Sequence, residues 1–364
     1  YDKLGRITAL TDRLGLTISV SYDKCGNPVS LTEGGERTYF YEYDACGRLI
    51  KTVNPLGEIT AYAYDGAGNL LSVTDGRGNS THYSYDVLNR PAAVRDAMDG
   101  ITSYAYDREG RPVTVTTPEG RRTAYVYDAV GQLVEIEEGQ THGGGTRRIT
   151  YTYDSLSRVV SDADAEGRLA SYDYDAFGGI TRAEDALDNA HVYEYDAEGR
   201  LLLDIYPNGE KETFTYLATG EVKTYTDRYG VKTTFSYDAM GRVTESSDTA
   251  GNRTAYAYDA AGNLVRQTDV LGRSIFYEYD VFGRVAAISD VDGAKTHYVY
   301  DALDRLVCVT DAAGNETTYA YDGAGNLIRT TKPGEAVCDY AYDALNRLDE
   351  KRNPEGETTV YAYD

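Results

Sequence analysis

The chain has 364 residues, of which 36 are tyrosine and 37 glycine, with no tryptophan, and its formal net charge at pH 7 is −23. Proteins bind nucleic acids and anionic membrane surfaces largely through cations, so this charge argues against both as partners. No run of eighteen apolar residues occurs, which argues against membrane insertion by this segment.

The dipeptide Tyr-Asp recurs every 21 residues from Tyr1, with one longer step of 26 residues between Tyr127 and Tyr153. Tyr216 keeps the spacing although Leu217 replaces the aspartate. Such periodicity is the signature of a repeat architecture. We therefore expect residues 1–364 to form a single array of about seventeen repeats, with a five-residue insertion between Tyr127 and Tyr153 and no separate globular domain.

Each repeat begins with a turn pattern directly after its motif tyrosine. A glycine stands four residues after that tyrosine, and Asn89, Ser157, Asp304 or Asn346 replaces it in some repeats. Asn and Asp are the non-glycine residues that best tolerate positive φ, so the column predicts a left-handed backbone. Because an acidic residue or asparagine usually stands three residues earlier, we expect a type I turn followed by a bulge.

A strand and a second turn follow. After the first glycine come Arg or Asn and then an apolar residue, as in Arg48-Leu49. A second glycine column then recurs, usually with an acidic residue or Asn three positions earlier. This column comprises Gly15, Gly57, Gly78, Gly120, Gly167, Gly209, Gly230 and later members. We call the two connections the first and the second turn of a repeat.

The repeat closes with the pattern Thr-x-Tyr-x-Tyr, as at residues 60–64. Its period of two predicts a β-strand with aromatic rings on one face, and tyrosine suits such a face because its hydroxyl can remain hydrated. Rings two strands apart must be separated by residues of the strand between them, some of them arginines, which allows cation–π contacts.

The odd period constrains the pairing of these strands. If both turns had the same length, the register would slip by one residue per repeat and exchange the two faces of the sheet. Either the two turns differ in length, or each repeat contains one strand bulge.

Together the elements predict an antiparallel meander of roughly 34 strands, two per repeat. An open sheet rarely exceeds about ten strands without coiling, so this ribbon is expected to coil. A β-propeller should alternate inner and outer hairpins, and no such 42-residue period is visible. Neither face is uniformly aliphatic, which argues against two sheets packed on a dry core.

The repeat resembles the RHS or YD repeat, as Tyr43-Asp44-Ala45-Cys46-Gly47-Arg48-Leu49 illustrates, and the resemblance covers the whole chain. It implies an all-β fold in which the two-strands-per-repeat meander coils into a spiral shell, a β-ribbon solenoid. In bacterial members the shell encloses a C-terminal toxin domain, although neither that domain nor the self-cleaving segment before it is recognisable here.

The resemblance implies a structural, non-enzymatic segment that encloses or presents a toxin domain lying outside it. It implies a secreted or cell-surface location, and flanking shell and toxin domains of the same polypeptide as partners. A cell-surface adhesion module that binds carbohydrate or protein is the alternative.

No residue is assigned a catalytic, cofactor-binding or metal-binding role. The histidines at 82, 142, 191 and 297 are dispersed, and the cysteines at 25, 46, 308 and 338 are too far apart by strand spacing to pair, so four free thiols are expected. The turn aspartates could bind Ca²⁺, but we expect them to cap their turns. The insertion, with Glu137, His142 and Gly143–Gly145, predicts an elongated hairpin tip.

Overall fold

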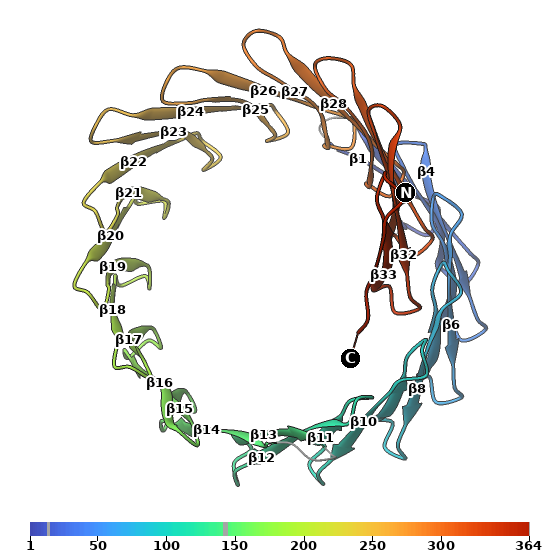
Figure 1. The fold of residues 1–364 in the computed structure, drawn as a ribbon, viewed down its shortest axis with the longest axis horizontal. Coiled ribbons are helices and arrows are strands. Elements are labelled where there is room, and N and C mark those ends of the chain that lie inside the picture. Colours follow the sequence, from blue (N-terminus) through green and yellow to red (C-terminus); the bar gives the residue numbers. More distant parts are fainter. Residues whose placement is uncertain (13–14, 141–144, 364) are drawn as a thin grey trace. The chain divides into compact units, whose positions relative to one another are not determined.

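The computed structural model describes residues 1–12, 15–140 and 145–363, whose regular elements are all β-strands (Figure 1). The strands of the first half are β1 (Ala9–Thr11), β2 (Thr17–Tyr22), β3 (Pro28–Glu33), β4 (Arg37–Tyr43), β5 (Leu49–Val53), β6 (Ile59–Tyr64), β7 (Leu70–Thr74), β8 (Ser80–Tyr85), β9 (Pro91–Arg95), β10 (Ile101–Tyr106), β11 (Pro112–Thr116), β12 (Arg121–Tyr127), β13 (Leu133–Gln140), β14 (Arg147–Tyr153), β15 (Val159–Asp164), β16 (Gly167–Tyr174) and β17 (Ile180–Asp185).

The strands of the second half are β18 (Ala190–Tyr195), β19 (Leu201–Ile205), β20 (Lys211–Tyr216), β21 (Val222–Thr226), β22 (Lys232–Tyr237), β23 (Val243–Asp248), β24 (Arg253–Tyr258), β25 (Leu264–Thr268), β26 (Ser274–Tyr279), β27 (Val285–Ser289), β28 (Lys295–Tyr300), β29 (Leu306–Thr310), β30 (Glu316–Tyr321), β31 (Leu327–Lys332), β32 (Ala336–Tyr342), β33 (Leu348–Arg352) and β34 (Thr358–Val360). They form one 34-stranded sheet in which successive strands pair antiparallel, as in β4–β5 and β5–β6. The predicted all-β meander is confirmed.

Both turns of a repeat belong to the same class. In the first turn, the N–H of Gly47 donates to the carbonyl of Asp44 at 3.0 Å, and the N–H of Asp44 donates to the carbonyl of Arg48 at 2.9 Å. In the second, the N–H of Gly57 donates to the carbonyl of Asn54 at 2.9 Å. The type I turn with a bulge is therefore confirmed at both ends, and the alternative of unequal turn lengths is wrong for this repeat.

A strand bulge instead corrects the register. Glu42 pairs with Lys51 but Tyr43 pairs with Leu49, so Ile50 is an extra residue on β5. The same shift precedes the motif tyrosine in other repeats, including those at Tyr64, Tyr85 and Tyr300. One extra residue per repeat keeps the tyrosines on one face despite the odd period.

The glycine columns have the predicted backbone conformation. Gly47 and Gly57 have φ of 77° and 83°, and the substitutes Asn89, Ser157 and Asp304 have φ of 59°, 65° and 65°. The prediction from residue type alone is therefore confirmed. The turn before Gly167 is shorter than the rest, because Asp164 pairs directly with Gly167.

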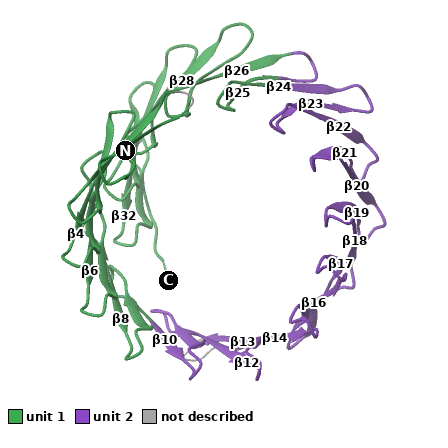
Figure 2. Ribbon diagram, turned by 180° about the vertical axis from the view of Figure 1, so that it is seen from behind, with its two compact units in different colours: residues 1–102, 257–267, 273–364 green, residues 103–256, 268–272 purple. Residues whose placement is uncertain are grey.

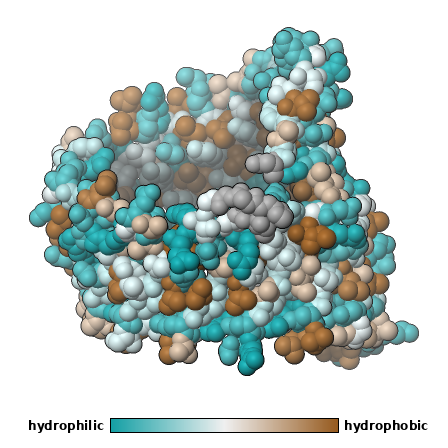
Figure 3. Space-filling view, turned by 60° about the horizontal axis from the view of Figure 1, so that its bottom comes forward, coloured by the Kyte–Doolittle hydropathy of each residue, from teal (hydrophilic) through white to brown (hydrophobic). Residues whose placement is uncertain are grey.

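The tyrosine-bearing strands have one half-buried side and one more exposed side, whereas the strands between them, such as β5 and β19, are half-buried on both sides. In β6, Tyr62 and Tyr64 are half-buried while Ala63 between them is exposed. Among the described residues only two apolar side chains, Ala124 and Ala287, count as buried, and none of the large side chains is fully buried. Hydrophobic residues appear as small separate clusters on the surface in Figure 3. The prediction that no dry core lies between two packed sheets is therefore confirmed.

The contacts divide the chain into two compact units (Figure 2). Unit 1 contains residues 1–102, 257–267 and 273–364, and unit 2 contains residues 103–256 and 268–272. Both consist of the same hairpin repeat. Unit 1 therefore brings together repeats from the two ends of the sequence.

Candidate functional site

The turn aspartate is the centre of each first turn. The Oδ1 of Asp44 accepts hydrogen bonds from the N–H groups of Cys46 at 2.9 Å and Arg48 at 3.0 Å, while its Oδ2 accepts one from Arg48 Nε at 2.7 Å. The bond from the Arg48 N–H is the main cause that holds the pKa of Asp44 below its usual range. Where asparagine replaces the arginine, Asn69 Nδ2 donates to Asp65 in the same way, at 2.8 Å. The capping prediction is confirmed.

The arginine of the turn also links neighbouring repeats. The Arg48 guanidinium lies 4.9 Å from the ring centroid of Tyr64, and its Nη1 donates to the carbonyl of Asp65 at 2.8 Å. Arg158 and Arg284 make the same two contacts with the repeats that follow them. The cation–π contacts allowed by the sequence are thus present, and each stacks one first turn on the next.

The motif tyrosine compensates for the bulge. The ladder between β5 and β6 ends at Lys51 and Ala61, which leaves the Leu49 carbonyl beyond the last ladder pair. The hydroxyl of Tyr64 donates to this carbonyl at 2.9 Å, and Tyr85, Tyr279 and Tyr342 do the same fifteen residues after their acceptors. The hydroxyl that we expected to be hydrated is therefore bonded to the protein in these repeats.

A second kind of contact joins repeats that are far apart in sequence. Within unit 1, second turns of repeats 2–5, counted from Tyr1, meet first turns of repeats 14–17. The paired repeats are twelve or thirteen apart, as between Glu58 of repeat 3 and Arg305 of repeat 15, which lie 3.9 Å apart. The first turns of the late repeats thus pack against the second turns of the early repeats.

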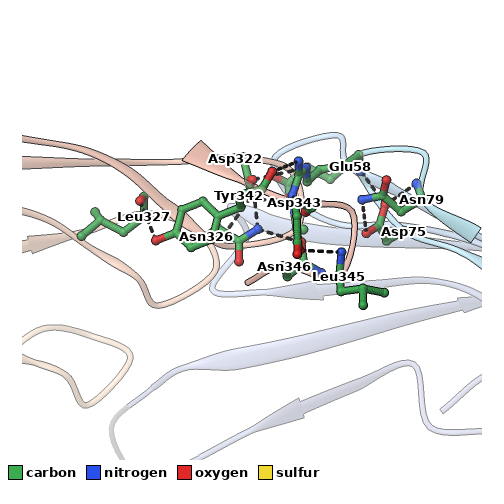
Figure 4. A network of polar contacts seen from close by, with 12 residues as sticks. Glu58, Asp75, Asn79, Asp322, Asn326, Leu327, Tyr342, Asp343, Leu345 and Asn346 are labelled. Atoms are coloured by element: carbon green, nitrogen blue, oxygen red, sulfur yellow. Dashed lines mark hydrogen bonds and ion pairs between the residues drawn. The ribbon is translucent and has the colours of Figure 1, made fainter. Parts of the chain in front are cut away.

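Arg77 is the centre of this contact. Figure 4 shows Asp343 and Asn346 of a late first turn close to Asp75 of an early second turn. Its guanidinium donates to the carbonyls of Tyr342 at 2.9 Å and Asp343 at 3.0 Å, and to Asn346 Oδ1 at 3.1 Å. Its Nε also lies 3.5 Å from Asp322 Oδ2. One side chain of the fourth repeat therefore binds the turns of the sixteenth and seventeenth.

Two glycines make this approach possible. An added Cβ on Gly323 would lie 2.7 Å from the carbonyl oxygen of Gly76, closer than real Cβ contacts. Gly66 occupies the same turn position as Gly323 twelve repeats earlier, and a Cβ there would meet nothing within 4 Å. Most other repeats have alanine or a larger residue at this position. Gly323 is therefore required by the contact, not by the turn.

Arg37 forms the other strong link. Only 5% of the residue is exposed, and its guanidinium lies 3.7 Å from the ring centroid of Phe282 and is bound to the carboxylate of Asp304. That carboxylate is 267 residues away in sequence and also accepts from Arg284 at 2.9 Å. The hydrogen bond from Arg37 is the main cause that holds the pKa of Asp304 below its usual range.

The residues singled out from the sequence do not gather into a reactive centre. His191 Nδ1 lies 3.0 Å from Asp204, whereas His82 and His297 are exposed on β8 and β28; His142 lies outside the described residues. No three His, Cys, Asp or Glu groups in the described part of the chain are placed to hold a metal ion. All four cysteines are free thiols, as predicted. Within the described ranges of the chain, no helix is long and apolar enough to span a membrane.

The insertion lengthens one hairpin. β13 and β14 pair as far as Glu138 and Arg147, so the strands extend toward the insertion as expected. Residues 141–144, which include His142, Gly143 and Gly144, lie outside the described residues.

A shallow apolar groove of about 430 Å³ lies on the tyrosine face of unit 2, lined in part by Phe214, Tyr225 and Phe235. Phe214 and Phe235 replace tyrosine in two consecutive repeats, and the Phe214 ring centroid is 5.1 Å from that of Tyr225. Burial, with the neighbouring Glu212 carboxylate, raises the pKa of Tyr225 to about 12. The groove therefore lies where two consecutive repeats have phenylalanine in place of the tyrosine that stands two residues before the motif tyrosine.

The geometry defines a β-hairpin repeat array of the kind that builds protein shells. Comparison with protein families agrees: the teneurin YD-shell model matches residues 170–321 and 211–364, and the RHS repeat model matches segments between residues 1 and 169. The first covers more than half of the chain. The chain therefore belongs to the RHS/YD-repeat family.

Solved structures show the same fold. A TcdB2-TccC3 structure without its hypervariable C-terminal region matches 99% of this chain with a TM-score of 0.64 and 17% identity. A Tc holotoxin pore from Photorhabdus luminescens matches 99% with a TM-score of 0.62 and 18% identity, and TcdB2-TccC3-Cdc42 matches 96% with a TM-score of 0.61 and 17% identity. This chain spans only 23%, 22% and 22% of those chains, respectively. No curated protein sequence matches. The chain is a shell-forming repeat segment.

Proposed function

We propose that this segment is part of the wall of a bacterial toxin of the Rhs or polymorphic type, and that the wall encloses or presents a C-terminal toxin domain outside residues 1–364. In this proposal residues 1–364 act as one array of seventeen repeats, without an enzymatic part or a cofactor. The protein is secreted or attached to the cell surface, and its partners are the flanking shell and toxin domains of the same polypeptide.

The contact between repeats twelve or thirteen apart is the observation that carries this proposal. A structural wall needs links along the ribbon and links between distant parts of it. The Arg48–Tyr64 stacking provides the first, and the Arg77 and Arg37 contacts provide the second. Support also comes from the matched Tc toxin structures, one of which is described as a TcdB2-TccC3 structure without its hypervariable C-terminal region.

Limited proteolysis of the natural full-length polypeptide tests the proposal. The region after residue 364 should be protected in the wild type and in Gly66→Val, and cleaved faster in Gly323→Val, whose side chain opens the contact at Gly76. Gly66→Val is the matched control because it changes the same turn position. A C-terminal region that is cleaved equally fast in all three proteins would contradict an enclosing or protecting wall.

A cell-surface adhesion or binding module is the second candidate, and the groove at Phe214, Tyr225 and Phe235 favours it. The groove is apolar and open, which suits a protein segment better than a hydrophilic glycan. Binding of the segment to cells and to a glycan array, compared between wild type and Phe214→Asp, would separate the two candidates. Loss of specific binding in Phe214→Asp supports the second.

A further inference from the structure

The groove on the tyrosine face of unit 2 has one charged side chain among the described residues that line it. Four consecutive strands, β20 to β23, supply the lining, which combines the rings of Phe214, Tyr225 and Phe235 with aliphatic side chains and the carboxylate of Glu212. Glu212 is half-buried on β20, on the same side of the strand as Phe214. The groove is therefore an aromatic surface with one negative group in its wall.

Two residues of β20 depart together from the pattern Thr-x-Tyr-x-Tyr. Glu212 stands in the place of the threonine, and Phe214 stands in the place of the first tyrosine. The usual residue of the first column is illustrated by Thr60, Thr81 and Thr233, and Glu212 is the only acidic residue in that column of the sequence. Because the other repeats form the same strand without a carboxylate here, the fold does not require one.

The surroundings of Glu212 are electrostatically unfavourable without an added cation. Glu212 stands directly opposite Asp204 in the antiparallel pair β19–β20, and like charges directly opposite each other destabilise a sheet. Asp204 has a partner in His191, whose Nδ1 lies 3.0 Å from it. In the described part of the chain no lysine or arginine forms an ion pair with Glu212, whose hydrogen-bonding neighbours are the side chains of Tyr206 and Tyr225.

A cation on an apolar stem matches this surface. An ammonium group is attracted both to the faces of aromatic rings and to a carboxylate, and the methylene stem of a lysine packs along apolar surface. A carboxylate offers about four lone pairs, so two hydroxyl donors leave Glu212 able to accept from an ammonium group. A metal ion is a poorer match, because no three His, Cys, Asp or Glu groups in the described residues are placed to hold one.

The shape of the groove indicates that the cation belongs to a protein segment. Sites for small molecules are concave and bury most of the ligand. This groove is shallow and is also lined by Val222 and Val243, which a lone amine would leave uncovered.

We propose that the groove binds a lysine side chain of an extended protein segment, with the ammonium group beside Glu212 and the methylene stem on the rings of Phe214 and Phe235. The proposal deepens the second candidate function and rests on it for the choice of a protein segment as the occupant.

The six phenylalanines of the chain provide a local measurement of binding. In protein labelled with para-fluorophenylalanine, the fluorine NMR signals of Phe214 and Phe235 report on the groove. The other four report on other places in the chain: Phe40, Phe177, Phe276 and Phe282. Single substitutions of each phenylalanine by leucine assign the signals.

A pentapeptide with a central lysine is the probe. At about 0.15 M salt the Debye length is about 8 Å, which limits non-specific attraction by the net charge of −23. The lysine peptide should shift the signals of Phe214 and Phe235 and leave the other four in place. The same peptide with norleucine at its centre keeps an apolar stem and lacks the charge, so it should bind at least about tenfold more weakly.

Two variants test the carboxylate. Glu212→Thr restores the residue that this column has at Thr60 and Thr81, so the strand should fold as it does in those repeats, and Glu212→Gln keeps the size of the side chain. Both should weaken binding of the lysine peptide at least about tenfold. Glu194→Gln is the matched control, because it removes the same charge from an exposed position on β18 and should leave binding unchanged.

The proposal is overturned if the lysine peptide leaves the signals of Phe214 and Phe235 in place, or if the norleucine peptide binds equally well. Equal weakening by Glu212→Gln and Glu194→Gln would overturn it too, because the net charge alone would then attract the peptide. The measurement involves no cells, so its failure is distinguishable from a failure of cell binding, which tests the second candidate function.

Discussion

Gly323 lies so close to Gly76 that a methyl group added to it would be 2.7 Å from the Gly76 carbonyl oxygen, although 247 residues separate the two in sequence. Gly66 occupies the same turn position without any neighbour within 4 Å. Comparing Gly323 with Gly66 therefore shows that the contact between distant repeats, and not the turn itself, requires a glycine at residue 323.

Gly323→Val should therefore destabilise the protein by about 1–3 kcal/mol through overpacking, whereas Gly66→Val should change its stability by under about 0.5 kcal/mol. Urea unfolding of both variants measures the difference. Equal losses would mean that the turn position itself requires glycine and that the contact contributes nothing.

The first-turn glycine should tolerate asparagine but not a β-branched residue. Gly68 has φ of 95°, and asparagine occupies the equivalent site at residues 89 and 346 with φ of 59° and 61°. Gly68→Val should cost about 1–3 kcal/mol from backbone strain, and Gly68→Asn clearly less. Thermal unfolding of the two variants checks the order, and a Val variant as stable as the Asn variant would refute the left-handed turn.

The motif tyrosine hydroxyl should contribute to stability through its bond to the carbonyl beside the bulge. Tyr279 donates to the Leu264 carbonyl at 2.8 Å, so Tyr279→Phe should cost about 1 kcal/mol. Tyr277→Phe is the control, because phenylalanine occurs naturally in that column at residues 214 and 235. We expect a smaller loss of unfolding free energy for the control, and a loss as large as that of Tyr279→Phe would contradict the role of the hydroxyl.

Acid should weaken the contact between Arg37 and Asp304. The pKa of the Asp304 carboxyl is depressed in the folded protein, so its contribution is present above the unfolded pKa of about 3.9 and is lost as the pH falls through the folded value. Because 57% of the Asp304 side chain is exposed, solvent screening limits the effect to about 1 kcal/mol. Unfolding free energies at neutral pH and at pH about 3 should differ less in Asp304→Asn than in the wild type. An identical pH dependence in both proteins would contradict this.

The local structure could be predicted from the sequence because the same residue pattern recurs in repeat after repeat along the chain. Asn89 and Asp304 in the glycine column indicated the positive φ, and the residues three positions before each glycine indicated the turn. The bulge at Ile50 could not be distinguished from unequal turns, because both restore the same register.

The contacts between distant repeats could not be predicted in the same way. A repeat pattern describes each repeat and its neighbour, and it contains no information on which distant repeats meet. Gly323 was nevertheless a signal, since it departs from the alanine that most repeats have at that position. Arg77, which follows Gly76 in the same turn, was a weaker signal.

A double-mutant cycle on Arg37 and Asp304 is the most direct test of the claim that repeats twelve or thirteen apart are locked together in this array. Unfolding free energies of Arg37→Ala, Asp304→Ala, the double variant and the wild type give the coupling between the two side chains. A coupling of about 1 kcal/mol or more is predicted, since Arg37 is buried and bound to that carboxylate. Additive losses, with a coupling below about 0.3 kcal/mol, would show that the two repeats do not meet.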